Sequence, residues 1–205
     1  MQMCKRRATL AMTLLLAATA CGGGGDGEGA TPSTTEVQRS TTSSSTTTKT
    51  EPVDPSVVPD DPEDINEEYV EAVLNAHNRV IGDALRLQLE GADISEIVDR
   101  YNAIYVPEVA DALLTSVLQP SEEVLASLKR PPGDQIIDVV DLRVATSECV
   151  EAEVLADFSQ VLKSPPSPTP DIVVIRRAVE SSAHNETGWI SEGVIPGTDP
   201  GDAGC

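Results

Sequence analysis

The stretch of sequence that decides the fold reads CVEAEVLADF, from Cys149 to Phe158. Valine, alanine or phenylalanine stands at every second position, and three of the five positions between them carry a carboxylate. Because successive side chains point to opposite faces of a β-strand, this period of two predicts a strand with one buried face. The other face should lie mostly in water, as in a sheet that covers a core on one side.

Three further strands are expected around this one. Residues 136–144 are rich in β-branched side chains, which suit a strand. After a proline-rich loop at residues 164–170, we expect residues 172–179 and 187–194 to form the third and fourth strands. The second half of the chain thus predicts a four-stranded sheet.

The residues before the strands show helical periodicity. Apolar side chains recur at intervals of three and four in a first helix, which Asp61 should cap and Gly91 should end. Asp93 and Glu96 form a start like a capping box for a second helix. Pro107 should end or bend that helix, because proline has no N–H to donate.

Two more helical segments follow at residues 109–118 and 122–128, and Ser121 should cap the second of them. Helices first and strands second predict an α+β fold, with N-terminal helices packed on a curved four-stranded antiparallel sheet. The predicted domain spans residues 62–205, with helices in 62–128, strands in 134–194 and a tail at 195–205.

Two runs of residues carry a resemblance to known proteins. The runs ECVEAEV at residues 148–154 and NETGWI at residues 185–190 are similar to strands in small actinobacterial lipoproteins. Helices followed by four long strands resemble the cone-shaped fold of nuclear transport factor 2 and its relatives, the NTF2-like superfamily. The resemblance implies helices packed on a curved sheet. It carries over no catalytic residue, because none can be matched.

The N-terminus is typical of a secretory signal peptide. A basic start at residues 5–7 is followed by 13 residues without a charge, and a helix of that length spans only about 20 Å. The motif ATAC at residues 18–21 resembles a lipobox. It predicts a signal peptide at residues 1–20, cleavage before Cys21 and a lipid on that cysteine. The alternative is an ordinary cleaved signal peptide with a chance cysteine.

Residues 21–61 should form a disordered tether between the lipid and the domain. From residue 31 to residue 50, 14 of 20 residues are Ser or Thr. Such a segment cannot bury enough apolar surface to offset the entropy of ordering. We expect it to lift the domain off the membrane. An O-glycosylated stalk is the alternative for the same composition.

The charge of the chain excludes one class of partner. Removing the three basic residues of the signal peptide leaves 34 acidic residues against 11 basic ones, a net charge of −23. Phosphate backbones and anionic lipid head groups repel such a protein. We therefore expect no nucleic-acid partner, and a membrane attachment that depends on the lipid of Cys21.

No known catalytic motif is present in the sequence. It contains no HExxH, CxxC or GxSxG, and the glycines at residues 22–29 are not followed by the lysine of a phosphate-binding loop. We expect no cofactor and no metal. The prediction is a non-catalytic binding or interaction module for an envelope protein or a small ligand. The alternative is a small enzyme of the isomerase, dehydratase or cyclase type with a pocket in the cone.

Four residues are candidates for such a pocket, namely His77, Asp138, Tyr69 and Tyr101. His77 lies on the apolar side of the first helix, where it is either a base or ligand contact or a partly buried, hydrogen-bonded histidine. Asp138 alternates with apolar neighbours, so a strict strand would turn it inward, whereas a bulge or an edge position would leave it in water. Tyr69, Tyr101 and Tyr105 lie at helical spacing and alternatively belong to the core.

The cysteines predict one disulfide. Cys4 leaves with the signal peptide and Cys21 carries the lipid, so Cys149 and Cys205 remain. Disulfides form and persist outside the cytoplasm. We expect these two cysteines to pair and to hold the tail against the sheet. The alternative is that Cys205 stays free or pairs with a cysteine of a partner.

Replacing Cys21 with serine tests the anchor. The Cys21→Ser variant should leave the membrane fraction or stall in processing, because it has no thiol to carry the lipid. Membrane fractionation with a detergent-free salt wash measures this. A variant that stays in the washed membranes would contradict the lipobox.

Overall fold

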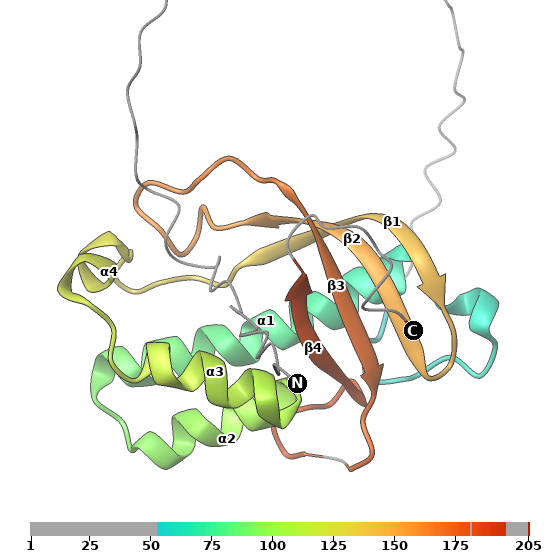
Figure 1. Cartoon of the computed structure of the whole chain (residues 1–205), viewed down its shortest axis with the longest axis horizontal. Coiled ribbons are helices and arrows are strands. Elements are labelled where there is room, and N and C mark those ends of the chain that lie inside the picture. Colours follow the sequence, from blue (N-terminus) through green and yellow to red (C-terminus); the bar gives the residue numbers. More distant parts are fainter. Residues whose placement is uncertain (1–52, 181, 196–204) are drawn as a thin grey trace, which may run out of the picture. The chain divides into compact units, whose positions relative to one another are not determined.

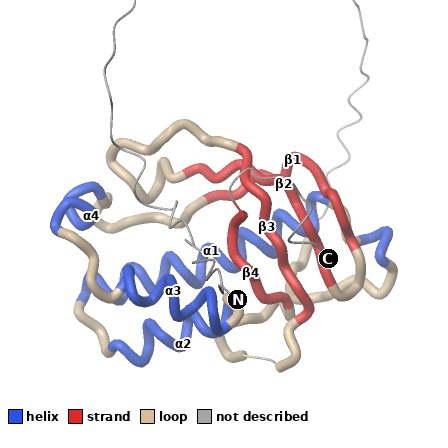
Figure 2. Tube along the Cα trace, viewed as in Figure 1, coloured by secondary structure: helices blue, strands red, loops and turns tan. Residues whose placement is uncertain are grey.

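The computed structural model describes residues 53–180, 182–195 and 205. The predicted signal peptide, Cys21 and most of the predicted tether and tail lie outside these residues. Within the described part, four α-helices precede a four-stranded antiparallel sheet, so the predicted α+β fold is confirmed (Figure 1, Figure 2). None of the helices in this part has the length and apolar character needed to span a membrane.

Most of the predicted helix boundaries are confirmed. The helices are α1 (Glu67–Glu90), α2 (Ile94–Ile104), α3 (Pro107–Val117) and α4 (Glu122–Ser127). Gly91 ends α1 with a left-handed φ of 77°, which glycine adopts without a steric penalty. Asp93 caps α2 and Ser121 caps α4, each through a side-chain oxygen that accepts from a backbone N–H. Pro107 separates α2 from α3 and is the first residue of α3.

The first helix begins later than predicted. Asp61 caps only a three-residue 3-10 turn, η1 (Pro62–Asp64). The cap of α1 is Asn66, whose Oδ1 accepts from the Tyr69 N–H at 3.0 Å. Between the two, Ile65 leaves helical geometry and is buried, with 2% of its surface exposed. The helix is interrupted at Ile65 because this conformation places the Ile65 side chain in the core, and burial of apolar surface is strongly favourable.

The sheet agrees with the prediction to within two residues at each strand end. Its strands are β1 (Ile136–Ala145), β2 (Cys149–Asp157), β3 (Pro170–Arg177) and β4 (Trp189–Ile195). They pair in chain order, each antiparallel to the next. Figure 1 shows α1 crossing behind the sheet, with α2 and α3 beside the end of β4.

Side chains of α1 also satisfy the free edge of β1. Asn75 donates from Nδ2 to the Ile137 carbonyl at 2.8 Å and accepts from the Ile137 N–H at 2.9 Å. Glu71 Oε2 accepts from the Val139 N–H at 3.2 Å. An edge strand with open N–H and carbonyl groups would invite pairing with another chain. These bonds therefore protect the edge and fix α1 against the sheet.

The choice of buried face decides the outcome for Asp138, because the pairing of β1 with β2 is regular from Ile136 to Val139 and the two register shifts lie beyond it. The register with β2 shifts between Val139 and Asp141 and again between Leu142 and Val144. Ile137 is buried, whereas Asp138 is exposed. The inward position that a strict alternation gave Asp138 is therefore wrong. The side chain lies in water on an edge strand with bulges, which was the alternative.

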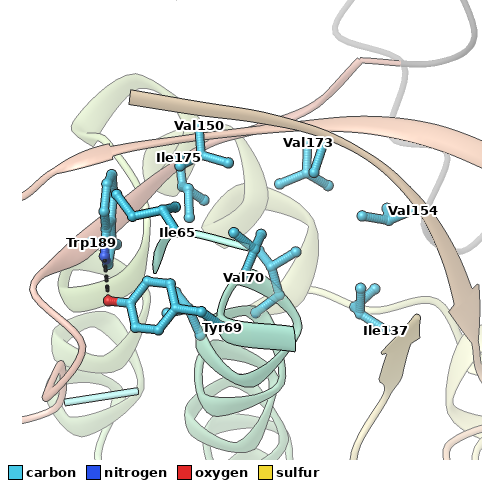
Figure 3. Close-up of a cluster of buried hydrophobic side chains, with 12 residues drawn as sticks. Ile65, Tyr69, Val70, Ile137, Val150, Val154, Val173, Ile175 and Trp189 are labelled. Carbon is cyan, nitrogen blue, oxygen red and sulfur yellow. Dashed lines mark hydrogen bonds between the residues drawn. The ribbon is translucent and has the colours of Figure 1, made fainter. Parts of the chain in front are cut away.

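The core between α1 and the sheet contains Trp189, whose side chain is fully buried. Its Nε1 donates to Tyr69 Oη at 2.9 Å (Figure 3). The guanidinium of Arg177 lies 5.6 Å from the centre of the ring, which is close enough for a cation–π interaction. Around this pair pack Ile65, Val70, Val150, Val154, Val173 and Ile175. A second cluster of buried residues lies among the helices, with Ala84, Ile97, Tyr101, Ala110 and Leu114.

The outer face of β2 is less wet than predicted. Cys149 and Glu151 are buried, with 5% and 3% of their surfaces exposed. Arg143 on β1 lies 3.8 Å from the Glu151 carboxylate and 3.0 Å from that of Glu153. A buried carboxylate needs a partner of opposite charge, and Arg143 provides it across the strand pair.

Cys149 and Cys205 lie at disulfide distance, as the sequence predicted, with their Sγ atoms 2.04 Å apart and their Cα atoms 5.6 Å apart. The two cysteines are 56 residues apart in the chain. A bridge across a loop of that length stabilises the fold by up to about 4 kcal/mol in the chain-entropy model, because it restricts the unfolded state.

Replacing either cysteine with alanine should therefore lower the free energy of unfolding by about 2–4 kcal/mol. The double variant Cys149→Ala, Cys205→Ala should be no less stable than the weaker single variant, since only one bridge is lost. Thermal unfolding without reductant measures both effects. Two free thiols in the mass spectrum of the non-reduced wild type would contradict the bridge.

Candidate functional site

A cavity of about 450 Å³ lies between the helices and the segments that flank the sheet. Cavities of this size typically hold one small organic molecule. The helices α1, α2, α3 and α4 line it, together with the segment before β1 and the segment after β2. Much of its surface is apolar and comes from Leu85, Leu113, Val117, Val124, Leu125 and Phe158.

The segment before β1 passes very close to α1 at Gly82. A Cβ atom on Gly82 would lie 2.2 Å from Asp134 Oδ1, so a larger residue there would displace the Asp134 carboxylate. Arg86, one turn further along α1, donates from Nη1 to Asp134 Oδ1 at 2.9 Å. At the opposite side, Gln88 donates to the Val117 carbonyl at the end of α3. Side chains of α1 thus hold two walls of the cavity in place.

The lining of the cavity carries no charge. In the part of the chain that the structure describes, no Asp, Glu, Lys, Arg or His belongs to the lining, although the chain has 34 acidic residues. Arg86 lies next to the wall, but it pairs with Asp83 at 2.7 Å and with Asp134 at 2.9 Å. Since an ion without a counter-ion is costly in an apolar site, the cavity suits an uncharged ligand.

Two tyrosines, Tyr101 and Tyr105, belong to the lining of the cavity. The rings of Tyr101 and Tyr105 stack with their centroids 6.1 Å apart, and Tyr101 is only 5% exposed. Burial raises the pKa of Tyr101, and it raises the pKa of Tyr105 to about 12. Both hydroxyls therefore keep their protons at physiological pH.

No hydrogen bond joins either hydroxyl to another described residue, although neither is among the fully buried atoms without a partner. Asn78, which also lines the cavity, has a buried Nδ2 without a partner. A buried donor left unpaired costs about 1–3 kcal/mol, and such groups are rare in native proteins. The orphaned Asn78 Nδ2, beside two tyrosines of the same lining, therefore indicates where a ligand would bind.

His77 is more deeply buried than predicted and does not line the cavity. It is 3% exposed, and its Nε2 lies 2.9 Å from Thr187 Oγ1. Thr187 donates its single hydroxyl proton to Asn185 Oδ1 at 2.8 Å and accepts from the Trp189 N–H at 3.2 Å. His77 must therefore donate from Nε2, which leaves Nδ1 without a proton.

The ring of His77 is accordingly neutral. Burial lowers the pKa of His77 to about 4, and the main chain of Trp189 opposes this shift more weakly. Nδ1 has no hydrogen-bond partner of acceptable geometry. His77 thus belongs to a buried network that joins α1 to the start of β4.

The structure does not bring the four predicted pocket residues together. Tyr101 lines the cavity, whereas Tyr69 belongs to the core beside Trp189 and Asp138 is exposed on β1. Asn78 was not among the pocket residues expected from the sequence. Its spacing from Gly82 and Leu85, four and seven residues further along α1, places all three on one helix face and could have indicated it.

Among the described residues, no three His, Cys, Asp or Glu side chains gather in a way that could hold a metal ion. Comparisons of the chain with protein-family models, with curated proteins and with solved structures found no match. The geometry of the chain alone therefore guides the interpretation of the cavity.

The buried neutral histidine predicts a specific pH dependence of stability. Since the pKa of His77 falls from 6.5 to about 4 on folding, the unfolded chain binds the proton first as the pH decreases. Above pH 6.5, the pKa of His77 in the unfolded chain, the free energy of unfolding should not depend on this histidine. It should fall by about 3 kcal/mol between pH 6.5 and pH 4. Urea unfolding at a series of pH values measures this loss.

A His77→Gln variant should lack this loss, because glutamine does not titrate but can still donate to Thr187. His184→Gln, at the other histidine of the chain, is the matched control and should keep it. An equal loss of stability in wild type and His77→Gln would show that other groups cause the pH dependence.

Proposed function

We propose that this protein is a membrane-anchored lipoprotein that faces outside the cytoplasm, with a domain that binds a small ligand without transforming it. The uncharged cavity among the helices carries this proposal. It has the size of a ligand site, an apolar surface and unpaired polar groups. These are the features that distinguish a binding site from an ordinary packing defect.

A binding role suits the chemistry of the lining better than catalysis does. General acid–base catalysis needs a titratable group within hydrogen-bond reach of the ligand. Neither Asp138 nor His77 lines the cavity. The tyrosine hydroxyls that do line it hold their protons firmly, since burial raises the pKa of both. Asp138 and His77, the two candidates for a general base, therefore do not support the alternative of an enzyme.

The remaining parts of the proposal come from the sequence. The lipobox at residues 18–21 and the Ser/Thr-rich segment after it support a lipid anchor and a spacer between membrane and domain. The order of helices and antiparallel strands is compatible with an NTF2-like domain. In such an arrangement the cavity would be presented to ligands outside the cytoplasm.

Filling the cavity tests the proposal. Val124 on α4 lines the cavity and is half-buried, so a Val124→Trp variant should fill part of it and exclude the ligand. The full-length lipoprotein is isolated from its own membranes in mild detergent, and native mass spectrometry detects bound small molecules. We expect an additional mass on the wild type that is absent from Val124→Trp.

Val57→Trp provides the matched control. Val57 is 64% exposed and does not line the cavity, so this variant should keep the ligand. Circular dichroism should show that both variants are folded. A wild type without any bound molecule, or a Val124→Trp variant that keeps it, would contradict a ligand site in this cavity.

A further inference from the structure

We propose that the ligand of this cavity is an uncharged, mainly apolar molecule with a carbonyl oxygen, which accepts hydrogen bonds from two of the donors Tyr101, Tyr105 and Asn78. The inference rests on the proposed function, because it names the chemical class of the ligand for the same cavity. Three observations carry it: the kind of unpaired groups, their position, and the absence of charge.

The unpaired groups can all act as donors. Asn78 has a buried Nδ2 without an acceptor, and the protonated hydroxyls of Tyr101 and Tyr105 have no acceptor among the described residues either. A ligand that satisfies them must present oxygen lone pairs. A carbonyl oxygen has two lone pairs and no proton of its own, so it can accept two of these bonds at once.

The fold brings these donors to one part of the cavity. α1 and α2 pack together as an antiparallel pair joined by the turn at Gly91. Asn78 precedes Gly91 by nearly as many residues as Tyr105 follows it, so the two lie at the same level of the pair. Tyr101 stacks on Tyr105, one turn away.

Apolar side chains of the lining lie further along the helices, next to uncharged polar ones such as Gln88, Gln119 and Ser121. Leu85 is two turns beyond Asn78 on α1, and Val124 and Leu125 on α4 face the same cavity. Phe158 closes it from the segment after β2. A ligand with a carbonyl at one end and a hydrocarbon body would match both regions.

Charged ligands fit poorly. A carboxylate would need a cation, but the described residues of the lining provide none, and Arg86 nearby is held by two carboxylates at 2.7 Å and 2.9 Å. An ammonium group would likewise find no acidic residue in the lining. Because a buried unpaired ion is far more costly than a buried neutral group, the cavity should discriminate by charge.

Three probes of similar length separate these features. Methyl decanoate has a carbonyl and no charge, decanoate is an anion at neutral pH, and undecane has no polar atom. Binding to the full-length lipoprotein in detergent is measured by displacement of a fluorescent apolar dye. We expect methyl decanoate to bind about tenfold more tightly than undecane, because of its hydrogen bonds, and about a hundredfold more tightly than decanoate.

The variants Tyr101→Phe, Tyr105→Phe and Asn78→Leu remove one donor each at nearly constant volume. Combining the two tyrosine substitutions should lower the affinity for methyl decanoate toward that for undecane and leave undecane binding unchanged. Tyr69→Phe is the matched control, since its hydroxyl pairs with Trp189 in the core. That variant should lower the melting temperature but keep the preference for methyl decanoate.

The outcomes separate the ligand class from the proposed function. Equal binding of all three probes, tighter binding of decanoate, or no effect of the double tyrosine substitution would overturn the carbonyl inference. A failure of all three probes to bind would overturn it as well. In each case a co-purified molecule that Val124→Trp excludes would leave the proposed function standing, whereas its absence would remove both.

Discussion

The side chain of Asn185 makes all four hydrogen bonds available to it inside the protein, and the arrangement of the helices depends on them. Its Oδ1 accepts from the N–H and the hydroxyl of Thr187, and its Nδ2 donates to the carbonyls of Ala103 and Trp189. One buried amide thereby joins the end of α2 to the start of β4. A buried polar group is tolerated only when its bonds are made. The position of α2, and with it that of Tyr101, follows from this requirement.

The long helix α1 divides the domain into two environments. Its first half packs on the sheet, where Val70 and Val73 meet the apolar face of β2 and β3 in a tightly filled core. Its second half, from Gly82 to Gln88, faces the other helices and holds the walls of the cavity. Protein interiors are normally densely packed. A cavity of about 450 Å³ beside the second half of α1 is therefore the proposed place for a ligand. The core between α1 and the sheet stabilises the fold. The cavity lies outside this core, so a ligand could bind there without disturbing it.

The charges of the protein are kept away from this interior. The chain carries 34 acidic residues, yet the cavity lining has none among the described residues, His77 is held neutral, and burial keeps the tyrosine hydroxyls protonated. A site of this kind can select a ligand by shape and hydrogen bonding, but it has little capacity to transfer protons. The acidic surface would serve a different purpose, since net charge favours solubility. The distribution of charge therefore supports the proposal of a binding role.

Local patterns in the sequence determined the type and the order of the elements. The alternation in β2, the stop at Gly91 and the caps at Asp93 and Ser121 each depend on a few neighbouring residues, so they could be recognised before the structure was known. The pairing of Cys149 with the last cysteine of the sequence followed from counting the cysteines. Only the tertiary structure decided which faces meet. The packing of the Ile137 face of β1 into the core left Asp138 in water, and the packing of α1 against α2 brought Tyr101 into a cavity together with Asn78. Such outcomes depend on contacts between residues far apart in the chain, and no local period contains that information.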